Sequence, residues 1–235
     1  DQVLDGDEVE LGRDPLIAED DVVYFTDGAG RPTIYDMEGP HVSDWRTVTP
    51  QPPYLTDLWH LTTVRAVEPD DLNPAHSPTH SWRCANDPAG TNPAATYRIA
   101  GQRILNGLVS PTMVVTGLTN NVFIRFNEFY RTEEIKDFGK VQVTLDGTNW
   151  IDVREGKSGE SGGWISSTVD LGLQSAQLGG GVVFTSEIFR VRFLFDTTDA
   201  RNNAFEGWYI DDVEVFEGFN LTGVVRDAFG LCPVP

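Results

Sequence analysis

The sequence predicts an all-β chain, folded as an antiparallel β-sandwich of the jelly-roll type. Apolar and polar residues alternate with a period of two from about position 108 onward, which places one face of each strand on a core and the other in water. No segment shows a convincing amphipathic-helix pattern. Glycine-rich stretches and an Asp-Gly pair separate the alternating segments, and strands that follow one another without helices favour a sandwich or jelly roll.

Four segments are the clearest strands. They are residues 122–130, 140–145, 187–195 and 208–216. The two faces of 187–195 hold Phe189, Val191, Phe193 and Phe195 on one side, and Arg190 and Arg192 with Ile188 and Leu194 on the other. We expect the phenylalanine and valine face to lie on the core, because strand side chains alternate between the two faces of a sheet.

Turn residues separate these strands. Asp146-Gly147 lies between two strand candidates and predicts a hairpin with a type I′ turn, in which both central residues need positive φ. Residues 156–163 are a Gly/Ser-rich connection. We expect only a turn near 57–64, and a long irregular loop over 66–98, which is rich in Pro, Asn, Ser and Asp.

The chain divides into three parts by composition. Residues 1–32 form an acidic N-terminal extension, residues 33–217 the β-sandwich, and residues 218–235 a C-terminal tail. The two cysteines, Cys84 and Cys232, are either a disulfide that ties the tail to the body or two unrelated thiols, since bridge geometry cannot be read from the sequence.

The net charge limits the partners. With 17 Lys+Arg and 36 Asp+Glu the chain carries −19, which argues against nucleic acid and against anionic membrane surfaces. No apolar run approaches the roughly 18 residues of a membrane span, so we expect no membrane insertion. The same charge suits the binding of cations or of neutral ligands.

Two motifs that suggest catalysis or zinc have simpler explanations. Gly159-Glu160-Ser161-Gly162-Gly163 fits a nucleophile elbow, but a strand-like segment follows it where an elbow needs a helix, so we interpret it as a hairpin loop. His76 and His80 have the i, i+4 spacing of helical zinc ligands, but Pro78 between them blocks the helix.

Carboxylates gather in four places along the chain. The groups are Asp36 with Glu38, Glu133 and Glu134 with Asp137, Asp196 with Asp199, and Asp211 with Asp212. Adjacent strand residues point to opposite faces, so either Asp211 or Asp212 turns inward and needs a partner. A metal is the simplest one, and a hard cation such as Ca²⁺ takes carboxylate and carbonyl oxygens from separate segments.

Other residues are candidates for contact with a ligand. Trp59 and Trp82 lie in the irregular half of the chain and are the tryptophans expected to be exposed, as a platform for sugar stacking. Glu128, Glu133 and Asp137 are the nearest candidates for the carboxylate pair that a glycoside hydrolase needs, about 5–10 Å apart in a cleft.

The order of these segments resembles the bacterial MAM-like jelly-roll domains, of the kind found in immune-inhibitor-A-like metallopeptidases and choice-of-anchor surface proteins. The resemblance covers roughly residues 33–217, and Gly-Trp-Tyr-Ile-Asp-Asp-Val at 207–213 is its most specific part. It implies a secreted or surface-bound, non-catalytic, concanavalin-like sandwich with structural Ca²⁺. Carried over, it implies a metal site made of Asp36, Glu38, Asp211 and Asp212, with Asp87 as a further ligand.

These observations predict a non-catalytic accessory domain of a larger extracellular protein, stabilised by Ca²⁺ and binding carbohydrate or protein. Neighbouring domains of that protein are expected partners. A hydrolase that uses a carboxylate pair and a purely structural or assembly domain are the alternatives that the residues leave open.

Overall fold

Two antiparallel sheets packed face to face make up the computed structural model, which describes residues 34–38, 40–49, 56–65, 79–114, 122–171 and 188–217. The first sheet consists of β10 (Ile165–Asp170), β7 (Val122–Arg131), β12 (Gly207–Glu217), β4 (Ser81–Cys84) and β3 (Trp59–Thr62), with β1 (Ile34–Tyr35) pairing with β12. The second sheet consists of β2 (Arg46–Val48), β5 (Leu105–Val109), β11 (Ile188–Asp196), β8 (Phe138–Thr144) and β9 (Ile151–Lys157), with β6 (Met113–Val114) pairing with β11.

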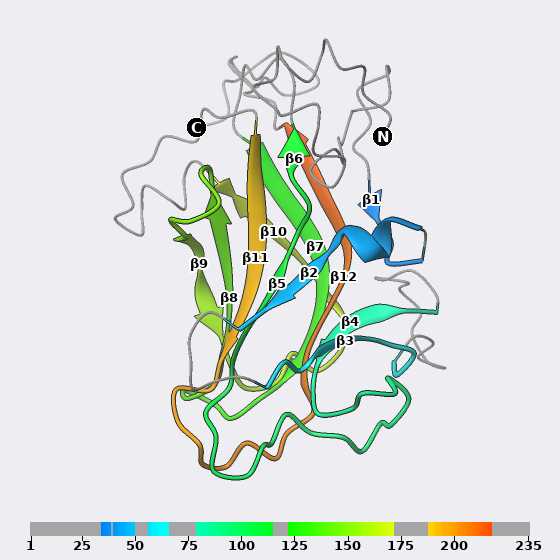
Figure 1. Cartoon of the computed structure of the whole chain (residues 1–235), viewed down its shortest axis with the longest axis vertical. Coiled ribbons are helices and arrows are strands. Elements are labelled where there is room, and N and C mark those ends of the chain that lie inside the picture. Colours follow the sequence, from blue (N-terminus) through cyan, green and yellow to red (C-terminus); the bar gives the residue numbers. More distant parts are fainter. Residues whose placement is uncertain are drawn as a thin grey trace, which may run out of the picture.

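The chain passes back and forth between the two layers. From β7 onward it moves to the second sheet for β8 and β9 and returns to the first for β10. It then crosses to the second sheet for β11 and back to the first for β12. Figure 1 shows the second sheet in front of the first. The only described helix longer than one residue is the short 3₁₀ helix η2 (Pro40–Asp44). The predicted all-β sandwich is therefore confirmed.

The core lies between the sheets, and the predicted face of β11 forms its centre. Phe193 has no exposed surface and packs against the rings of Phe126, Trp208 and Trp45 at centroid distances of 4.9, 5.8 and 6.2 Å. These contacts join both sheets, because Phe126 and Trp208 come from the first. Gly139 on β8 faces Trp208, and a Cβ added there would lie 2.8 Å from the indole ring.

Two strands occupy segments that the sequence predicted as irregular. The expected turn near 57–64 is β3, and the expected loop over 66–98 contains β4, with which β3 pairs. That prediction was wrong because these strands have four residues each and all four residues of β4 are buried, so no alternation shows. The loop after β4 covers their outer face, where the Gly90 carbonyl accepts hydrogen bonds from Thr62 Oγ1 and from the Thr63 backbone N–H.

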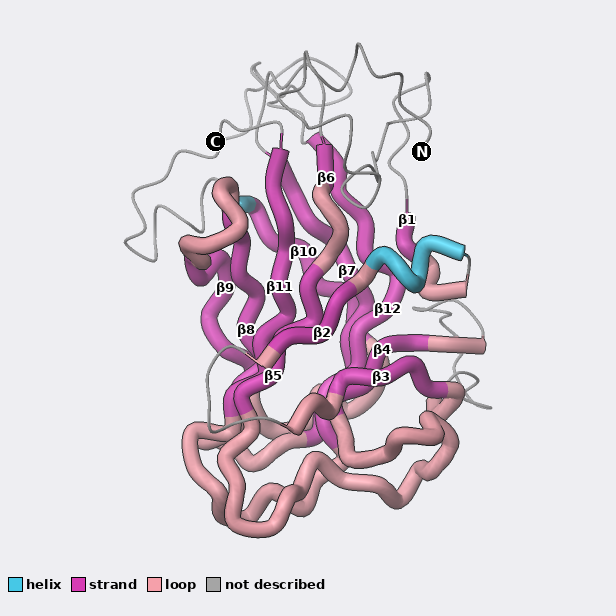
Figure 2. The backbone as a smooth tube through the Cα atoms, in the orientation of Figure 1, coloured by secondary structure: helices cyan, strands magenta, loops and turns pink. Residues whose placement is uncertain are grey.

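Long loops gather at one end of the sandwich, at the bottom of Figure 2. They are held together around Tyr97, whose ring contacts Phe195 at a centroid distance of 5.0 Å and stacks on Phe205 at 6.4 Å. The Tyr97 backbone N–H also donates to the Phe205 carbonyl. The buried ring of Tyr97 thus holds the irregular loops at this end of the sandwich in fixed positions.

The predicted hairpin between β8 and β9 is present, but its turn is not type I′. Six residues, 145–150, connect the strands, and Gly147 has a φ of 75° whereas Asp146 is not among the residues with positive φ. Instead the Asp146 carboxylate accepts hydrogen bonds from the backbone N–H groups of Asn149 and Thr148, at 2.7 and 2.8 Å. These bonds hold the pKa of Asp146 below its usual value and fix the loop.

The motif at 159–163, predicted as a hairpin loop, lies in the connection 158–164, which crosses between the sheets. It links β9 of the second sheet with β10 of the first, and strands on both sides exclude the strand-turn-helix of a nucleophile elbow. Ser161 serves the backbone of Tyr130, receiving a hydrogen bond from its N–H at 3.1 Å.

Several predicted features lie outside the described residues: the N-terminal extension 1–32, the C-terminal tail 218–235, His76 and Cys232. Cys84 is a free thiol with no exposed surface. Within the described residues, no helix has the length and hydropathy needed to cross a membrane.

Candidate functional site

Asp211 on β12 is buried, as the Asp211-Asp212 pair predicted for one of its members, but it lies on the side of the first sheet that carries Tyr209, away from the core between the sheets. It has no exposed surface, and the strand register shifts immediately after it, between Asp211 and Glu214, at a bulge where Asp212 has a φ of 48°. Burial and the negative charges of Asp212, Glu38 and Asp36 raise the pKa of Asp211 to about 9. The structure therefore brings together the four acidic residues at positions 36, 38, 211 and 212.

A buried hydroxyl lies beside this acidic cluster. Trp82 pairs with Ile210, so the antiparallel register carries Ser81 opposite Asp211. Ser81 is 1% exposed, and its Oγ has no hydrogen-bond partner among the described residues. An oxygen of this kind beside the buried carboxylate of Asp211 supplies the donor type that a hard cation takes.

Glu38 already has partners of its own. Its carboxylate accepts hydrogen bonds from Thr79 Oγ1 and the His80 backbone N–H, and His80 Nδ1 lies 3.0 Å from it. Burial raises the pKa of Glu38, but the bonds from Thr79 and His80 outweigh it and leave the pKa below its usual value. In the described part of the chain no three His, Cys, Asp or Glu side chains converge as a metal ligand set. The oxygen donors thus fit Ca²⁺, but the carboxylates of the described residues do not converge on a common position.

Asp87 is not brought to the acidic cluster. Cys84, at the end of β4, pairs with Trp208, so the chain that continues to Asp87 leaves the sheet away from Asp211. The Asp87 carboxylate instead accepts from the Asn92 backbone N–H at 2.7 Å and lies 3.7 Å from Arg83. It organises the loop after β4.

Glu128, a candidate for a hydrolytic carboxylate, points into the core and has no exposed surface. Arg154 of the second sheet donates to it through both Nη atoms, at 2.5 and 3.1 Å. Ser167 Oγ at 2.6 Å and Trp208 Nε1 at 2.9 Å complete its hydrogen bonds. This carboxylate cross-links the sheets and is not displayed to a substrate.

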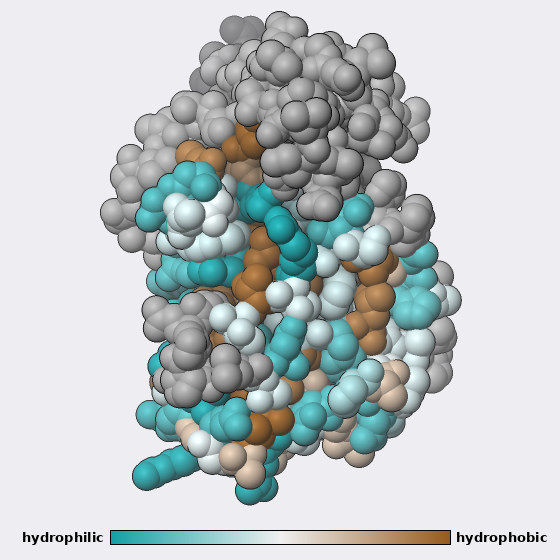
Figure 3. Space-filling view, viewed as in Figure 1, coloured by the Kyte–Doolittle hydropathy of each residue, from teal (hydrophilic) through white to brown (hydrophobic). Residues whose placement is uncertain are grey.

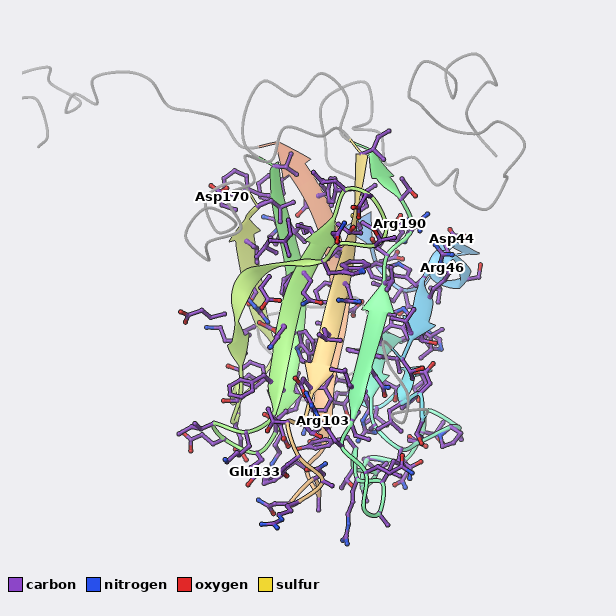
Figure 4. The ribbon with its side chains drawn as sticks, turned by 60° about the vertical axis from the view of Figure 1, so that its left-hand side comes forward. Asp44, Arg46, Arg103, Glu133, Asp170 and Arg190 are labelled. Carbon is purple, nitrogen blue, oxygen red and sulfur yellow. The ribbon has the colours of Figure 1, made fainter. Side chains whose placement is uncertain are left out.

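Glu133 and Asp137 lie in the turn between β7 and β8, at the loop end of the sandwich, where Figure 4 labels Glu133. Asp137 is fully buried; Tyr97 Oη donates to its Oδ2 at 2.5 Å, and no described residue forms a hydrogen bond with its Oδ1. Burial, together with the charges of Glu133 and Asp199, raises the pKa of Asp137 to about 7. Glu133 is partly exposed, so the pair is a buried carboxyl beside a surface one.

The two tryptophans expected at the surface are buried, which corrects the sequence prediction. Trp59 is 5% exposed and Trp82 is 8% exposed. Trp59 packs 5.8 Å from the ring of Trp208 and donates from Nε1 to the Asn106 carbonyl at 3.2 Å. Each lies on a short strand facing the core, so neither forms a sugar-stacking platform.

The outer face of the second sheet carries a row of residues that sequence reasoning missed. Successive cross-strand partners place in one line, from β9 to β2, the residues Asp152, Gln142, Arg192, Val109 and Arg46. We call this line the transverse row. It lies on the face seen in Figure 3, where hydrophilic and hydrophobic residues both reach the surface. Partners directly opposite each other point to the same side of a sheet, so these five side chains share one surface.

Contacts along the transverse row fix its polar groups. Arg192 Nε donates to Gln142 Oε1 at 2.8 Å, and Gln142 Nε2 donates to Asp152 Oδ1 at 2.6 Å. The Arg192 guanidinium lies over the Trp150 ring, 4.1 Å from its centroid. Gly107 leaves room for the Arg192 stem, since a Cβ there would lie 2.8 Å from Arg192 Cδ. The result is a hydrogen-bonded set of donors and acceptors held in fixed positions on a sheet face, with Gln142 9% exposed.

One signal in the sequence pointed to this surface. Arg190 and Arg192 share the outer face of their strand, in the pattern that places Phe193 on the core. The row itself could not be found from the sequence, because it joins residues from position 46 to position 192 through four strand pairings.

The sequence matches no known protein family, and no curated protein matches it. Solved structures with a similar fold include the carbohydrate-binding module TmCBM61 in complex with β-1,4-galactotriose, with a TM-score of 0.44, 9% identity, and coverage of 79% of this chain and all of that one. The K3 cleaved adhesin domain of Lys-gingipain from Porphyromonas gingivalis W83 has a TM-score of 0.43 and 14% identity, over 79% of this chain and 98% of that one. The family 11 carbohydrate-binding module of the Clostridium thermocellum cellulase Lic26A-Cel5E has a TM-score of 0.41 and 9% identity, over 82% and 98%. At this level of similarity these structures say nothing about what this chain binds.

Proposed function

We propose that this chain is a non-catalytic accessory domain of a secreted or cell-surface protein, and that it binds carbohydrate on the outer face of its second sheet. The transverse row carries the proposal. Gln142 and Arg192 are held in place by each other and by Trp150, and sugars are bound by planar hydrogen-bonding groups fixed in this way. A pre-organised face loses little side-chain entropy when the ligand arrives.

The state of the carboxylates supports binding without hydrolysis. Glu128 is occupied by Arg154, Ser167 and Trp208 inside the core. Asp137 is buried against Tyr97. Neither offers the accessible acid and base that glycoside hydrolysis needs.

A glycan array on the intact chain, with a broad screen for glycoside hydrolysis, tests the proposal. We expect binding to one class of polysaccharide and no release of reducing ends. Gln142→Ala removes the central amide of the row and should weaken binding at least tenfold, whereas Ser166→Ala, on exposed β10 of the other sheet, should leave it unchanged. Equal loss with both variants, or turnover of any glycan, would overturn the assignment.

We propose in addition that Ca²⁺ stabilises the fold through Asp36, Glu38, Asp211 and Asp212. The support is the buried carboxylate of Asp211, the negative charges of Asp212, Glu38 and Asp36 that raise its pKa, and the hydroxyl oxygen of Ser81 beside it. A cation bound by these oxygens would cross-link the segment after β1, strand β12 and the first residue of β4 in the folded state alone. Binding to the folded state alone stabilises it by about 2.7 kcal/mol when the free ion is at 100 times its dissociation constant.

Thermal unfolding with Ca²⁺ and with a chelator tests the metal site. We expect the midpoint to fall on chelation and to return with Ca²⁺. Asp211→Asn should abolish this response, whereas Asp87→Asn, which alters a carboxylate apart from the cluster, should retain it. An unfolding midpoint that does not change on chelation, or a response that is the same in the Asp211→Asn variant, would refute the proposed Ca²⁺ site.

A further inference from the structure

Most arginines in the described part of the chain are matched with a carboxylate. Six of them form such pairs: Arg65 with Glu206, Arg83 with Asp87, Arg103 with Asp196, Arg125 with Glu214, Arg131 with Glu160, and Arg154 with Glu128. This is expected for a chain with 36 acidic and 17 basic residues, because acidic groups are always near. Four arginines of the described part, Arg46, Arg98, Arg192 and Arg201, form no such pair.

The transverse row holds two arginines of that kind. Neither Arg192 nor Arg46 has a carboxylate within ion-pair distance among the described residues, although Asp152 stands in the same row. The Asp152 carboxylate accepts from Gln142 instead, and Arg192 meets only the neutral oxygen of that amide. Burial lowers the pKa of Arg192 to about 10, and the nearby charge of Asp152 opposes this shift only in part, so the guanidinium is partly withdrawn from water with no carboxylate at ion-pair distance among the described residues.

The free edge of Arg192 faces outward. Its Nε is used by Gln142, while its two Nη groups have no acceptor within the described residues and are not among the buried unpaired atoms. Trp150 fixes the guanidinium plane from one face. A guanidinium with a fixed plane and unused N–H groups is the partner that a carboxylate binds with two parallel hydrogen bonds.

We propose that the ligand of this face is a polysaccharide that carries carboxylate groups, of the uronic-acid class, with one carboxylate on Arg192 and another on Arg46. This inference rests on the proposed function and names its ligand class. Arg46 and Arg192 lie on strands two places apart, which separates them by about 10 Å at ~4.8 Å per strand. That span exceeds one sugar ring, so the site fits an oligosaccharide that runs across the strands.

Charge complementarity decides between this occupant and a neutral glycan. Lys140 and Arg190 also lie on the outer side of the same sheet, Lys140 opposite Leu194 and Arg190 opposite Thr144; Figure 4 shows Arg190 and Arg46 toward the same edge. A chain of net charge −19 repels distant anions, but salt screens that repulsion beyond about 8 Å at physiological ionic strength, so the local cations govern contact. Ionic attraction at this face is then the expected source of selectivity.

Calorimetric titration of the intact chain with polygalacturonate, and with its methyl ester, tests the inference. The two polymers share a backbone and differ in charge. We expect the acid form to bind at least tenfold more tightly than the ester, and raised salt to reduce that difference.

Variants locate the contact. Arg192→Gln and Arg46→Gln should each weaken binding of the acid polymer at least tenfold, and Arg46 is exposed, so its replacement leaves the fold intact. Arg131→Gln removes an exposed arginine of the other sheet and should change nothing. Gly107→Ala keeps every charge but displaces the Arg192 stem, and should also weaken binding.

Each failure has a distinct meaning. Equal binding of acid and ester refutes the carboxylate ligand and leaves carbohydrate binding in place. Binding of poly-glutamate as tight as that of polygalacturonate refutes a sugar-specific site. Absence of binding to every glycan on the array refutes both this inference and the proposed function.

Discussion

Replacing Glu128 by Gln tests whether this carboxylate is structural. The substitution keeps the shape of the side chain and the acceptor for Trp208 Nε1, but it leaves the Arg154 charge without a counter-charge between the sheets. The side chains of Glu128 and Arg154 are 0% and 10% exposed, so water cannot replace the lost partner. Breaking one side of a buried ion pair costs about 3–5 kcal/mol, and we expect a loss in this range.

Urea unfolding followed by tryptophan fluorescence measures the loss, since Trp208 lies against the pair. Glu160→Gln is the matched control: Glu160 and Arg131 are 60% and 54% exposed, and exposed pairs contribute about 0–1 kcal/mol. Replacing both Glu128 and Arg154 by apolar residues should restore much of the stability, because no unpaired charge remains. A loss below about 1 kcal/mol for Glu128→Gln, or a double variant less stable than the single one, would refute the reasoning.

Two further predictions concern the core and its pH dependence. In the folded chain Asp137 loses its proton near pH 7 and in the unfolded chain near its ordinary 3.8, so its contribution to stability falls as pH rises from about 4 to about 7. Asp137→Asn keeps an acceptor for Tyr97. The difference between its thermal-unfolding midpoint and that of the wild type should increase in favour of the variant from pH 5 to pH 8. The same difference at both pH values would contradict the raised pKa. Gly139→Ala places a Cβ against the Trp208 ring and should cost about 1–3 kcal/mol in urea unfolding, whereas Gly163→Ala meets no atom within 4 Å and should cost little; equal effects would contradict the packing.

The acidic residues show how far local pattern reaches. The adjacent pair Asp211-Asp212 predicted one carboxylate turned toward the core, since strand residues alternate; Asp211 is buried, but on the side of the first sheet that carries Tyr209, so the burial was predicted and the direction was not. Asp87 was joined to the same cluster by resemblance alone. The register of β4 against β12 carries it away, and register is a property of pairing that one strand does not encode.

The sequence by itself determined the fold class and the core face of β11, because a period of two and turn residues act locally. It did not reveal β3 and β4, whose four residues each are too few to show alternation. Trp59 and Trp82 on these strands face the core and are therefore buried. Only the tertiary structure decided which charges meet. Glu128 meets Arg154 across the core, while Arg192 and Arg46 share a row on the surface, because strand pairing and sheet packing bring together residues far apart in the chain.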